Sequence, residues 1–469
     1  MDARVGRRSA AILGVLVMVV AACSAAPAPS GSPIAAGAEP SPTVSRTPTP
    51  TASPSPRPQP TPEPSYSYES PEPTPSEEPI DEDPVEPEPS PTPVPAPPDG
   101  ALIVDWSTTR VDGLPEHMEI RGATQSASTW LLAGSEREEM ADGNVRNRGG
   151  IWRSEPGGRW EAVLDIEDGW VNDVAAFDAG FVAVGTMGGD ASVWLSNDGR
   201  RWRAVDDEAF AGGQMSQVGV TSSGFVAFGY GRSFDTGVIW TSPDGEEWLR
   251  ATNASGLRVA RGLKVLVRDD GRLTAFVGPR WDEQGSIEIW STTGRAEWQR
   301  VGTLPRSDDA TVSNAAHGPK GWVAVGRLKM QAWGPGVAWR SDDGKTWQRL
   351  TTGPDTATAM LADEAGFIAA GFTGGLPGET CGDPRPFRAQ TWTSTDGGVW
   401  REMPRDASFD QAFIVALFQD ARGLAGLGLR FDDGEWPYAP TAWSAALPGP
   451  SDDDAPPSDP SAAEQGCGD

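Results

Sequence analysis

The sequence has few of the residues that most catalytic and metal sites require. Its two histidines, His117 and His317, lack metal-ligand spacing, so zinc binding and serine–histidine chemistry are not expected. Positive charge is also scarce, because 38 Lys and Arg stand against 66 Asp and Glu, for a net charge of -28. So acidic a chain is repelled by nucleic acids and anionic lipid headgroups, and neither is expected as its main ligand.

Cysteine is nearly absent, and the first of the three cysteines, Cys23, follows Val-Ala-Ala. Before it stand Arg4, Arg7 and Arg8 and an apolar run over residues 10–22. The run is shorter than the roughly 20 residues that span a bilayer, which favours a signal peptide over residues 1–22 rather than an uncleaved membrane anchor. The segment resembles the lipobox of bacterial lipoproteins, which implies a lipidated Cys23 and a chain held at the extracellular face of the membrane.

The other two cysteines, Cys381 and Cys467, form an even pair in an expected oxidising compartment. We expect them to form a disulfide, which would remove roughly 4 kcal/mol of unfolded-chain entropy by closing a loop of about 86 residues. Two free thiols are the alternative.

Proline is concentrated before residue 100, in a segment of Pro, Ser, Thr and Glu with almost no large apolar side chains. Such a segment cannot bury enough surface to offset the entropy of ordering, so residues 23–100 are predicted to be a disordered linker. Dense proline and like charges favour an extended stalk of up to about 200 Å. Residues 448–469 are predicted to be an acidic, flexible tail.

Tryptophans in six pairs, each spaced eight residues apart, recur through the rest of the chain. The first tryptophans of successive pairs lie 42, 46, 50, 49 and 53 residues apart, the length of one four-stranded propeller blade. The pairs are Trp152/Trp160, Trp194/Trp202, Trp240/Trp248, Trp290/Trp298, Trp339/Trp347 and Trp392/Trp400.

Each repeat contains four short runs rich in Val, Ala, Phe and Trp, as at residues 172–177, 181–185, 192–196 and 202–205. Gly or Asp separates the runs, which predicts four strands joined by turns. Most repeats have a Ser-x-Asp-Gly turn before the second tryptophan. There the Asp can accept backbone N–H bonds, the Gly can take a positive φ, and the tryptophan fills space between blades.

Turn and strand pattern together resemble the Asp-box (BNR) repeats of sialidases, sortilin-type receptors, photosystem assembly factors and some glycoside hydrolases. The resemblance covers residues 101–447 and implies an all-β propeller of the sialidase-like superfamily, although each box is one residue shorter than the family pattern. In the first and fourth boxes Pro156 and Gly294 replace the aspartate, so these turns are expected to be less well fixed. The structural aspartates of the intact boxes would be Asp198, Asp244, Asp343 and Asp396.

The number of blades depends on the chain ends. After the sixth box, residues 423–428 and 441–444 provide two more strands of a repeat that lacks an outer strand. Residues 101–106 read as an orphan outer strand whose Trp106 matches the second tryptophan of a pair. We therefore predict a seven-bladed propeller closed by its N-terminal strand. A six-bladed ring with a decorated end is the alternative.

Long, varied loops are expected on the face opposite the Asp boxes, at residues 135–149, 278–286, 327–336, 372–389 and 430–440. Variable loops on a rigid scaffold usually carry binding, so this long-loop face is the candidate site. The predicted ligand-binding residues are Trp170, Tyr230, Trp281, Trp333, Trp436, Tyr438, Arg121 and Arg261. The residues expected to line the channel mouth are Glu119, Arg121, Asn172, Asp173, Gln217, Arg261, Asn314 and Asp410.

No catalytic residues are identified. A sialidase requires three arginines that grip a carboxylate and a tyrosine activated by a glutamate. No Phe-Arg-Ile-Pro segment, which would carry one of these arginines, occurs near the first blade, where the sequence has only Glu119-Ile120-Arg121. The sequence therefore favours binding over catalysis: a monomeric, cofactor-free, surface-anchored binding or scaffolding lipoprotein that recognises a glycan or an envelope protein. A sialidase-like glycoside hydrolase, or an assembly factor like the photosystem propellers, is the alternative.

Overall fold

The computed structural model describes residues 105–446, and several short segments between them lie outside the description. The predicted signal peptide, linker and tail therefore lie outside the described residues, as do Cys23, Cys381 and Cys467. No helix among the described residues is long and apolar enough to cross a membrane. The undescribed internal positions are 110, 141–144, 233–236, 252, 255–256, 259–262, 270, 279–284, 296, 309, 329–335, 352, 375–386 and 432–437.

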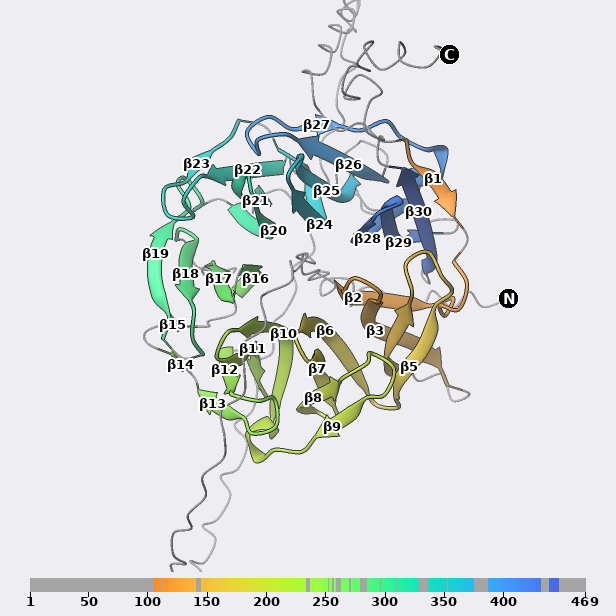
Figure 1. The fold of residues 1–469 in the computed structure, drawn as a ribbon, viewed down its shortest axis with the longest axis vertical. Coiled ribbons are helices and arrows are strands. Elements are labelled where there is room, and N and C mark those ends of the chain that lie inside the picture. Colours follow the sequence, from red (N-terminus) through yellow and green to blue (C-terminus); the bar gives the residue numbers. More distant parts are fainter. Residues whose placement is uncertain are drawn as a thin grey trace, which may run out of the picture. The chain divides into compact units, whose positions relative to one another are not determined.

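Seven four-stranded antiparallel sheets form the blades of a propeller, as predicted (Figure 1). The innermost strand of each sheet packs against the innermost strands of the two neighbouring blades.

Blade 1 contains β2 (Met118–Gln125), β3 (Trp130–Glu139), β4 (Val145–Ser154) and β5 (Glu161–Ile166). Blade 2 contains β6 (Gly169–Phe177), β7 (Gly180–Met187), β8 (Asp190–Ser196) and β9 (Arg203–Val205). Blade 3 contains β10 (Gly213–Thr221), β11 (Gly224–Gly231), β12 (Gly237–Ser242) and β13 (Leu249–Ala251). Blade 4 contains β16 (Leu263–Asp269), β17 (Arg272–Val277), β18 (Glu288–Thr292) and β19 (Gln299–Thr303). Blade 5 contains β20 (Ala310–Gly318), β21 (Gly321–Leu328), β22 (Gly336–Ser341) and β23 (Gln348–Arg349). Blade 6 contains β24 (Thr356–Asp363), β25 (Gly366–Thr373), β26 (Arg388–Ser394) and β27 (Arg401–Glu402). Blade 7 contains β28 (Ala412–Asp420), β29 (Gly423–Phe431), β30 (Tyr438–Ala446) and β1 (Ser107–Thr109).

Short elements occupy three of the connections between blades. Single 3-10 turns, η1 (Glu208–Phe210) and η2 (Ala407–Phe409), precede blades 3 and 7. A two-stranded ladder of β14 (Asn253–Ala254) and β15 (Leu257–Arg258) lies between blades 3 and 4.

The N-terminal strand closes the ring in the same register as every other outer strand. Thr108, two residues after Trp106, pairs with Trp443 of β30. Ala204, two residues after Trp202, likewise pairs with Trp194. The outer strand therefore starts after its tryptophan, and the strand predicted at residues 101–106 is corrected to Ser107–Thr109, with residues 101–104 outside the described part.

The tryptophan pairs hold connections and neighbouring blades together. Two first tryptophans donate their indole N–H to the segment that enters their blade: Trp240 Nε1 to the Ala209 carbonyl (2.8 Å) and Trp339 Nε1 to the Pro305 carbonyl (2.9 Å). Three second tryptophans, Trp160, Trp298 and Trp347, pack on an aromatic ring of the preceding blade. The ring of Trp298 lies 5.5 Å from that of Phe228, and the ring of Trp347 lies 5.5 Å from that of Phe276. The predicted role of the second tryptophan between blades is thus confirmed.

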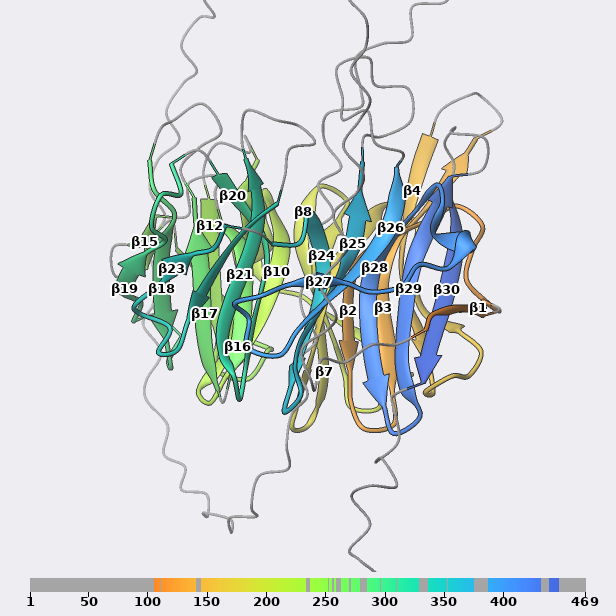
Figure 2. The same ribbon diagram turned by 90° about the horizontal axis from the view of Figure 1, so that it is seen from above.

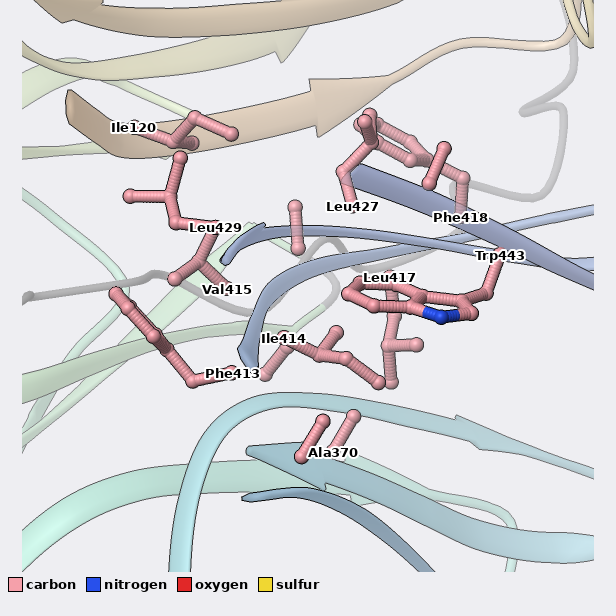
Figure 3. Packing of buried hydrophobic residues seen from close by; sticks show 14 of the residues in the cluster. Ile120, Ala370, Phe413, Ile414, Val415, Leu417, Phe418, Leu427, Leu429 and Trp443 are labelled. Carbon is pink, nitrogen blue, oxygen red and sulfur yellow. The ribbon is translucent and has the colours of Figure 1, made fainter. Parts of the chain in front are cut away.

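The seam between blades 7 and 1 is closed by packing as well as by β1. Phe418 is fully buried and stacks on Trp130 with ring centroids 4.7 Å apart. Beside it, Gln125 Oε1 accepts the Gln419 N–H (3.1 Å) and Gln125 Nε2 donates to the Gln419 carbonyl (3.3 Å). Figure 3 shows the surrounding apolar cluster, in which Ile120 of blade 1 and Ala370 of blade 6 lie on opposite sides of the blade 7 side chains, with Ile120 beside Leu429.

The Ser-x-Asp-Gly turns form the hydrogen bonds that the sequence predicts. Asp343 Oδ1 accepts the backbone N–H groups of Thr346 (2.7 Å) and Lys345 (2.8 Å), while Ser341 Oγ accepts the Gly344 N–H (2.9 Å). These bonds lower the pKa of Asp343 to about 2, with the Thr346 N–H contributing most. The same contacts occur at Asp198, Asp244 and Asp396.

The two altered boxes lack this carboxylate. In the fourth box Thr292 Oγ1 accepts the Gly294 N–H (3.0 Å), and in the first the Gly158 N–H bonds to the Glu155 carbonyl (2.7 Å). Trp298, which follows the fourth box, is buried with an indole N–H that has no described partner.

Candidate functional site

The innermost strands carry a β-bulge in every blade, near the end that meets the long-loop face. The register shifts between Ile120 and Gly122 in blade 1, between Val171 and Asp173 in blade 2, and so on around the ring. Arg121 and Asn172 are the extra residues of the first two bulges. A bulge turns a side chain out of the regular ladder, so it can place polar groups at this end of the ring.

Three residues predicted to line the channel mouth are instead buried, and two of them hold blades together. Asp173, Gln217 and Asn314 are at most 1% exposed. Asp173 Oδ2 accepts the Val218 N–H of the next blade (2.9 Å), and Asn314 Nδ2 donates to the carbonyl of Thr358 (2.8 Å). The prediction was wrong for these positions because the residue after each bulge points into the blade interface, where a buried polar group needs a partner.

Four residues come together at the long-loop end of blades 1 and 2, and we call them the Arg121 cluster: Glu119, Arg121, Trp170 and Asn172. Arg121 Nη2 bonds to Glu119 Oε2 at 2.8 Å, and Arg121 Nη1 donates to Asn172 Oδ1 at 3.1 Å. The Arg121 Cζ lies 6.0 Å from the centroid of the Trp170 ring, within the range of a cation–π contact. Asn172 Nδ2 donates onward to the Met215 carbonyl of blade 3 (2.7 Å), so both of its amide groups are engaged.

The cluster combines fixed orientation with partial access to solvent. The side chain of Arg121 is 32% exposed and that of Glu119 is 17% exposed. Trp170 and Asn172 are partly buried. Arg121 Nε is buried and has no hydrogen-bond partner among the described residues. The cluster therefore offers an aromatic face, a carboxylate and guanidinium N–H groups within one small area.

Glycine places the neighbouring hairpin close to Trp170. A Cβ at Gly149 of β4 would lie 3.0 Å from the Gly169 carbonyl oxygen and 3.1 Å from the Trp170 Cα, tighter than almost all real contacts. A side chain at this position would require the neighbouring backbone to shift by a few tenths of an ångström. The start of β6, and Trp170 with it, is therefore held against blade 1.

The predicted long loop at residues 135–149 is mostly strand. Glu136 pairs with Arg148 and Glu138 with Arg146, which extends the β3–β4 hairpin to Glu139 and Val145. Arg146 Nη2 also lies 3.1 Å from Glu138 Oε2. The loop prediction was wrong here because charged residues that alternate across a solvent-exposed hairpin resemble a polar loop in sequence.

Of the remaining predicted binding residues, the two that the structure describes lie on blades other than 1 and 2. Tyr230 is partly buried on β11 of blade 3, opposite Gln214. Tyr438 is the first residue of β30. Asp410, which was expected at the channel mouth, is exposed and forms an isolated backbone β-bridge with Arg388. Trp281, Trp333, Trp436 and Arg261 lie outside the described residues.

The charges near the Arg121 cluster are already paired. Glu119 is bonded to Arg121, and both carboxylate oxygens of Asp173 accept backbone N–H groups. Within the described ranges, no group of three or more His, Cys, Asp or Glu is placed to hold a metal ion. The arrangement can therefore donate and accept hydrogen bonds and stack a ring.

The sequence predicts each member of the Arg121 cluster as a binding or channel-mouth residue, but it does not predict that the four side chains contact one another. Arg121 and Asn172 occupy the same bulge position one repeat apart, and that equivalence is the signal that could have paired them.

Comparison with known proteins finds only distant structural likeness. No protein-family model matches the chain, and no curated protein matches it. Among similar solved structures, "YCF48 bound to D1 peptide" has a TM-score of 0.43 and 15% identity, covering 74% of this chain and 96% of that one. A mutant Trypanosoma rangeli sialidase displaying trans-sialidase activity has a TM-score of 0.38 and 10% identity, covering 73% and 59%. A structure from the GH130 family of mannoside phosphorylases has a TM-score of 0.33 and 10% identity, covering 74% and 95%.

Proposed function

We propose that this protein is a surface-anchored binding module that takes up a glycan at the Arg121 cluster. The observation that carries the proposal is the placement of Trp170 beside the Arg121–Glu119 pair and Asn172 at the long-loop end of the ring. The face of an indole suits the apolar face of a pyranose ring. Guanidinium N–H groups and a carboxylate can donate to and accept from its hydroxyls.

Preorganisation supports binding with useful affinity. Arg121 is held by Glu119 and Asn172, and Asn172 is held by the next blade, so these side chains lose little further freedom when a ligand arrives. The scaffold beneath is a closed ring of sheets. A rigid aromatic face with fixed polar partners is typical of sites that bind small polar ligands.

Binding is favoured over glycoside hydrolysis by the state of the nearby carboxylates. Two-carboxylate hydrolysis needs a general acid and a second free carboxylate on opposite sides of the scissile bond. In the Arg121 cluster Glu119 is paired with arginine, and beside it Asp173 is buried with both carboxylate oxygens bonded to backbone N–H groups. Both of these carboxylates are therefore engaged within the protein.

The proposal includes the place of the protein in the cell. The lipobox-like segment that ends at Cys23, followed by a Pro-rich linker over residues 23–100, supports a lipid anchor at the extracellular face of the membrane and a stalk that extends the propeller away from it.

The test is a glycan-array screen of the full-length protein and its Trp170→Ala variant, together with chromogenic glycosides. We expect the wild type to bind one group of related glycans without turnover, and the variant to lose this binding. Turnover would support a hydrolase instead. Absence of array binding, with capture of a specific envelope protein that Trp170→Ala abolishes, would support a protein ligand instead.

A further inference from the structure

The hairpins beside the Arg121 cluster differ in height. Ala133 of β3 and Val184 of β7 are equivalent, because each pairs with the residue that follows the bulge. From there β3 continues to Glu139, whereas β7 ends at Met187. The difference of three residues corresponds to about 10 Å at about 3.3 Å per residue. Figure 2 shows β4, the partner strand of β3, rising at the upper rim of the ring.

The short side is a compact turn that we call the low rim: Met187, Gly188, Gly189 and Asp190. All four residues are exposed, and a Cβ placed on either glycine would meet nothing within 4 Å. The turn is tied down, since the Gly188 N–H donates to the Asp168 carbonyl (3.0 Å). Asp190 Oδ1 also accepts the Gly212 N–H (2.6 Å). The low rim is therefore a fixed feature.

The low rim adjoins the Arg121 cluster directly. Trp170 pairs with Thr186, and the preceding Gly169 pairs with Met187. The side chain of Met187 is 44% exposed, which is unusual for a large apolar group and leaves its thioether available for contact. Met187 follows Thr186 along β7, so it lies one position beyond Trp170 towards the turn, with its side chain on the other face of the sheet.

We infer that the Arg121 cluster binds the terminal unit of a linear polysaccharide, whose chain continues outward over the low rim. This inference rests on the proposed function and adds the class of glycan to it. A site for a monosaccharide needs no exit, but a site for a terminal unit must be open on the one side where the chain continues. The β3–β4 hairpin obstructs one side, and the low rim provides the opening on the other.

The test compares chain lengths by titration calorimetry. The probes are chito-oligosaccharides and manno-oligosaccharides of two and of six units, and the protein is the full-length chain. We expect the six-unit form of the recognised sugar to bind about tenfold more tightly than the two-unit form, equivalent to about 1.4 kcal/mol. Equal affinity for the two lengths would overturn the inference and leave the proposed function standing. No binding by any probe would overturn both.

Two variants locate the effect at the low rim. Met187→Ala should weaken six-unit binding roughly threefold and leave two-unit binding unchanged, because it removes an apolar contact only on the exit path. An insertion of about four residues between Gly188 and Gly189 should abolish the length preference, since exposed loop tips tolerate insertion while the raised turn blocks the exit. The matched control is Leu249→Ala, an exposed aliphatic residue on the outer strand of blade 3, which should change neither affinity. A length preference that survives both rim variants would contradict the inference.

Discussion

Trp106 should contribute more to stability than its place before a three-residue strand suggests. Its side chain is 5% exposed, its indole N–H donates to the Thr391 hydroxyl of blade 6 (3.0 Å), and its ring lies 6.5 Å from that of Phe409. Replacing a buried tryptophan by alanine costs about 3–5 kcal/mol. Leaving the hydroxyl of Thr391, which is fully buried, without this donor adds about 1 kcal/mol.

Detachment of β1 limits the loss of unfolding free energy in the Trp106→Ala variant. The strand makes three register pairs with β30 and its residues are exposed, so it can separate without unfolding the ring. We therefore expect Trp106→Ala to lower the free energy of unfolding by about 3 kcal/mol, at the lower end of the range for such substitutions. Trp106→Phe, which keeps most of the apolar volume and loses the hydrogen bond, should cost about 1–2 kcal/mol.

Urea unfolding followed by circular dichroism measures both values, and sedimentation velocity provides a second readout. Loss of β1 exposes the edge of β30, so Trp106→Ala should associate in a concentration-dependent way. The matched comparison is Trp160→Ala, because β5 is continuous in the chain with the rest of blade 1 and should stay in place. A Trp106→Ala protein that remains monomeric and loses less than about 0.5 kcal/mol would refute closure of the ring by β1.

Further predictions concern the turns, the anchor and the cysteines. Since the pKa of Asp343 is lowered from 3.8 to about 2, its ionised form stabilises the fold above about pH 4 and this contribution disappears as the pH falls towards 2. The melting temperature of Asp343→Asn should therefore fall less steeply than that of the wild type over this pH range. Cys23→Ser should release the protein from the membrane or leave its signal peptide uncleaved, and a lipid-modified variant in the detergent phase would contradict the anchor. A non-reduced digest analysed by mass spectrometry should contain a peptide that joins Cys381 to Cys467, and two free thiols would disprove the disulfide.

The blade architecture was predictable because it depends on contacts that repeat along the chain. The tryptophan spacing measured the blade length, and the turn residues act through hydrogen bonds within a few positions. The unpaired Trp106 and Trp443 then predicted closure by the N-terminal strand, which the register confirms. The bounds of that strand were wrong, because it was placed at residues 101–106, ending on the tryptophan, whereas the observed strand Ser107–Thr109 follows the tryptophan.

The candidate site was less predictable because it depends on contacts between blades. Arg121 and Trp170 lie far apart in sequence, and nothing local indicates that a guanidinium of one blade reaches the ring of the next. Polar residues of the inner strands look alike in sequence, yet the bulge separates the partly exposed Asn172 from the buried Asp173 beside it. A polar residue after a bulge is thus a better signal of a bond between blades than of a channel lining.

A crystal structure of the protein with its best-binding oligosaccharide would show whether the Arg121 cluster binds a glycan. We expect a pyranose ring stacked on Trp170, with hydroxyls bonded to Arg121 and Glu119 and the chain continuing over Met187. A sugar bound on the face that carries the Ser-x-Asp-Gly turns, or on the long-loop face away from Trp170, would contradict this proposal.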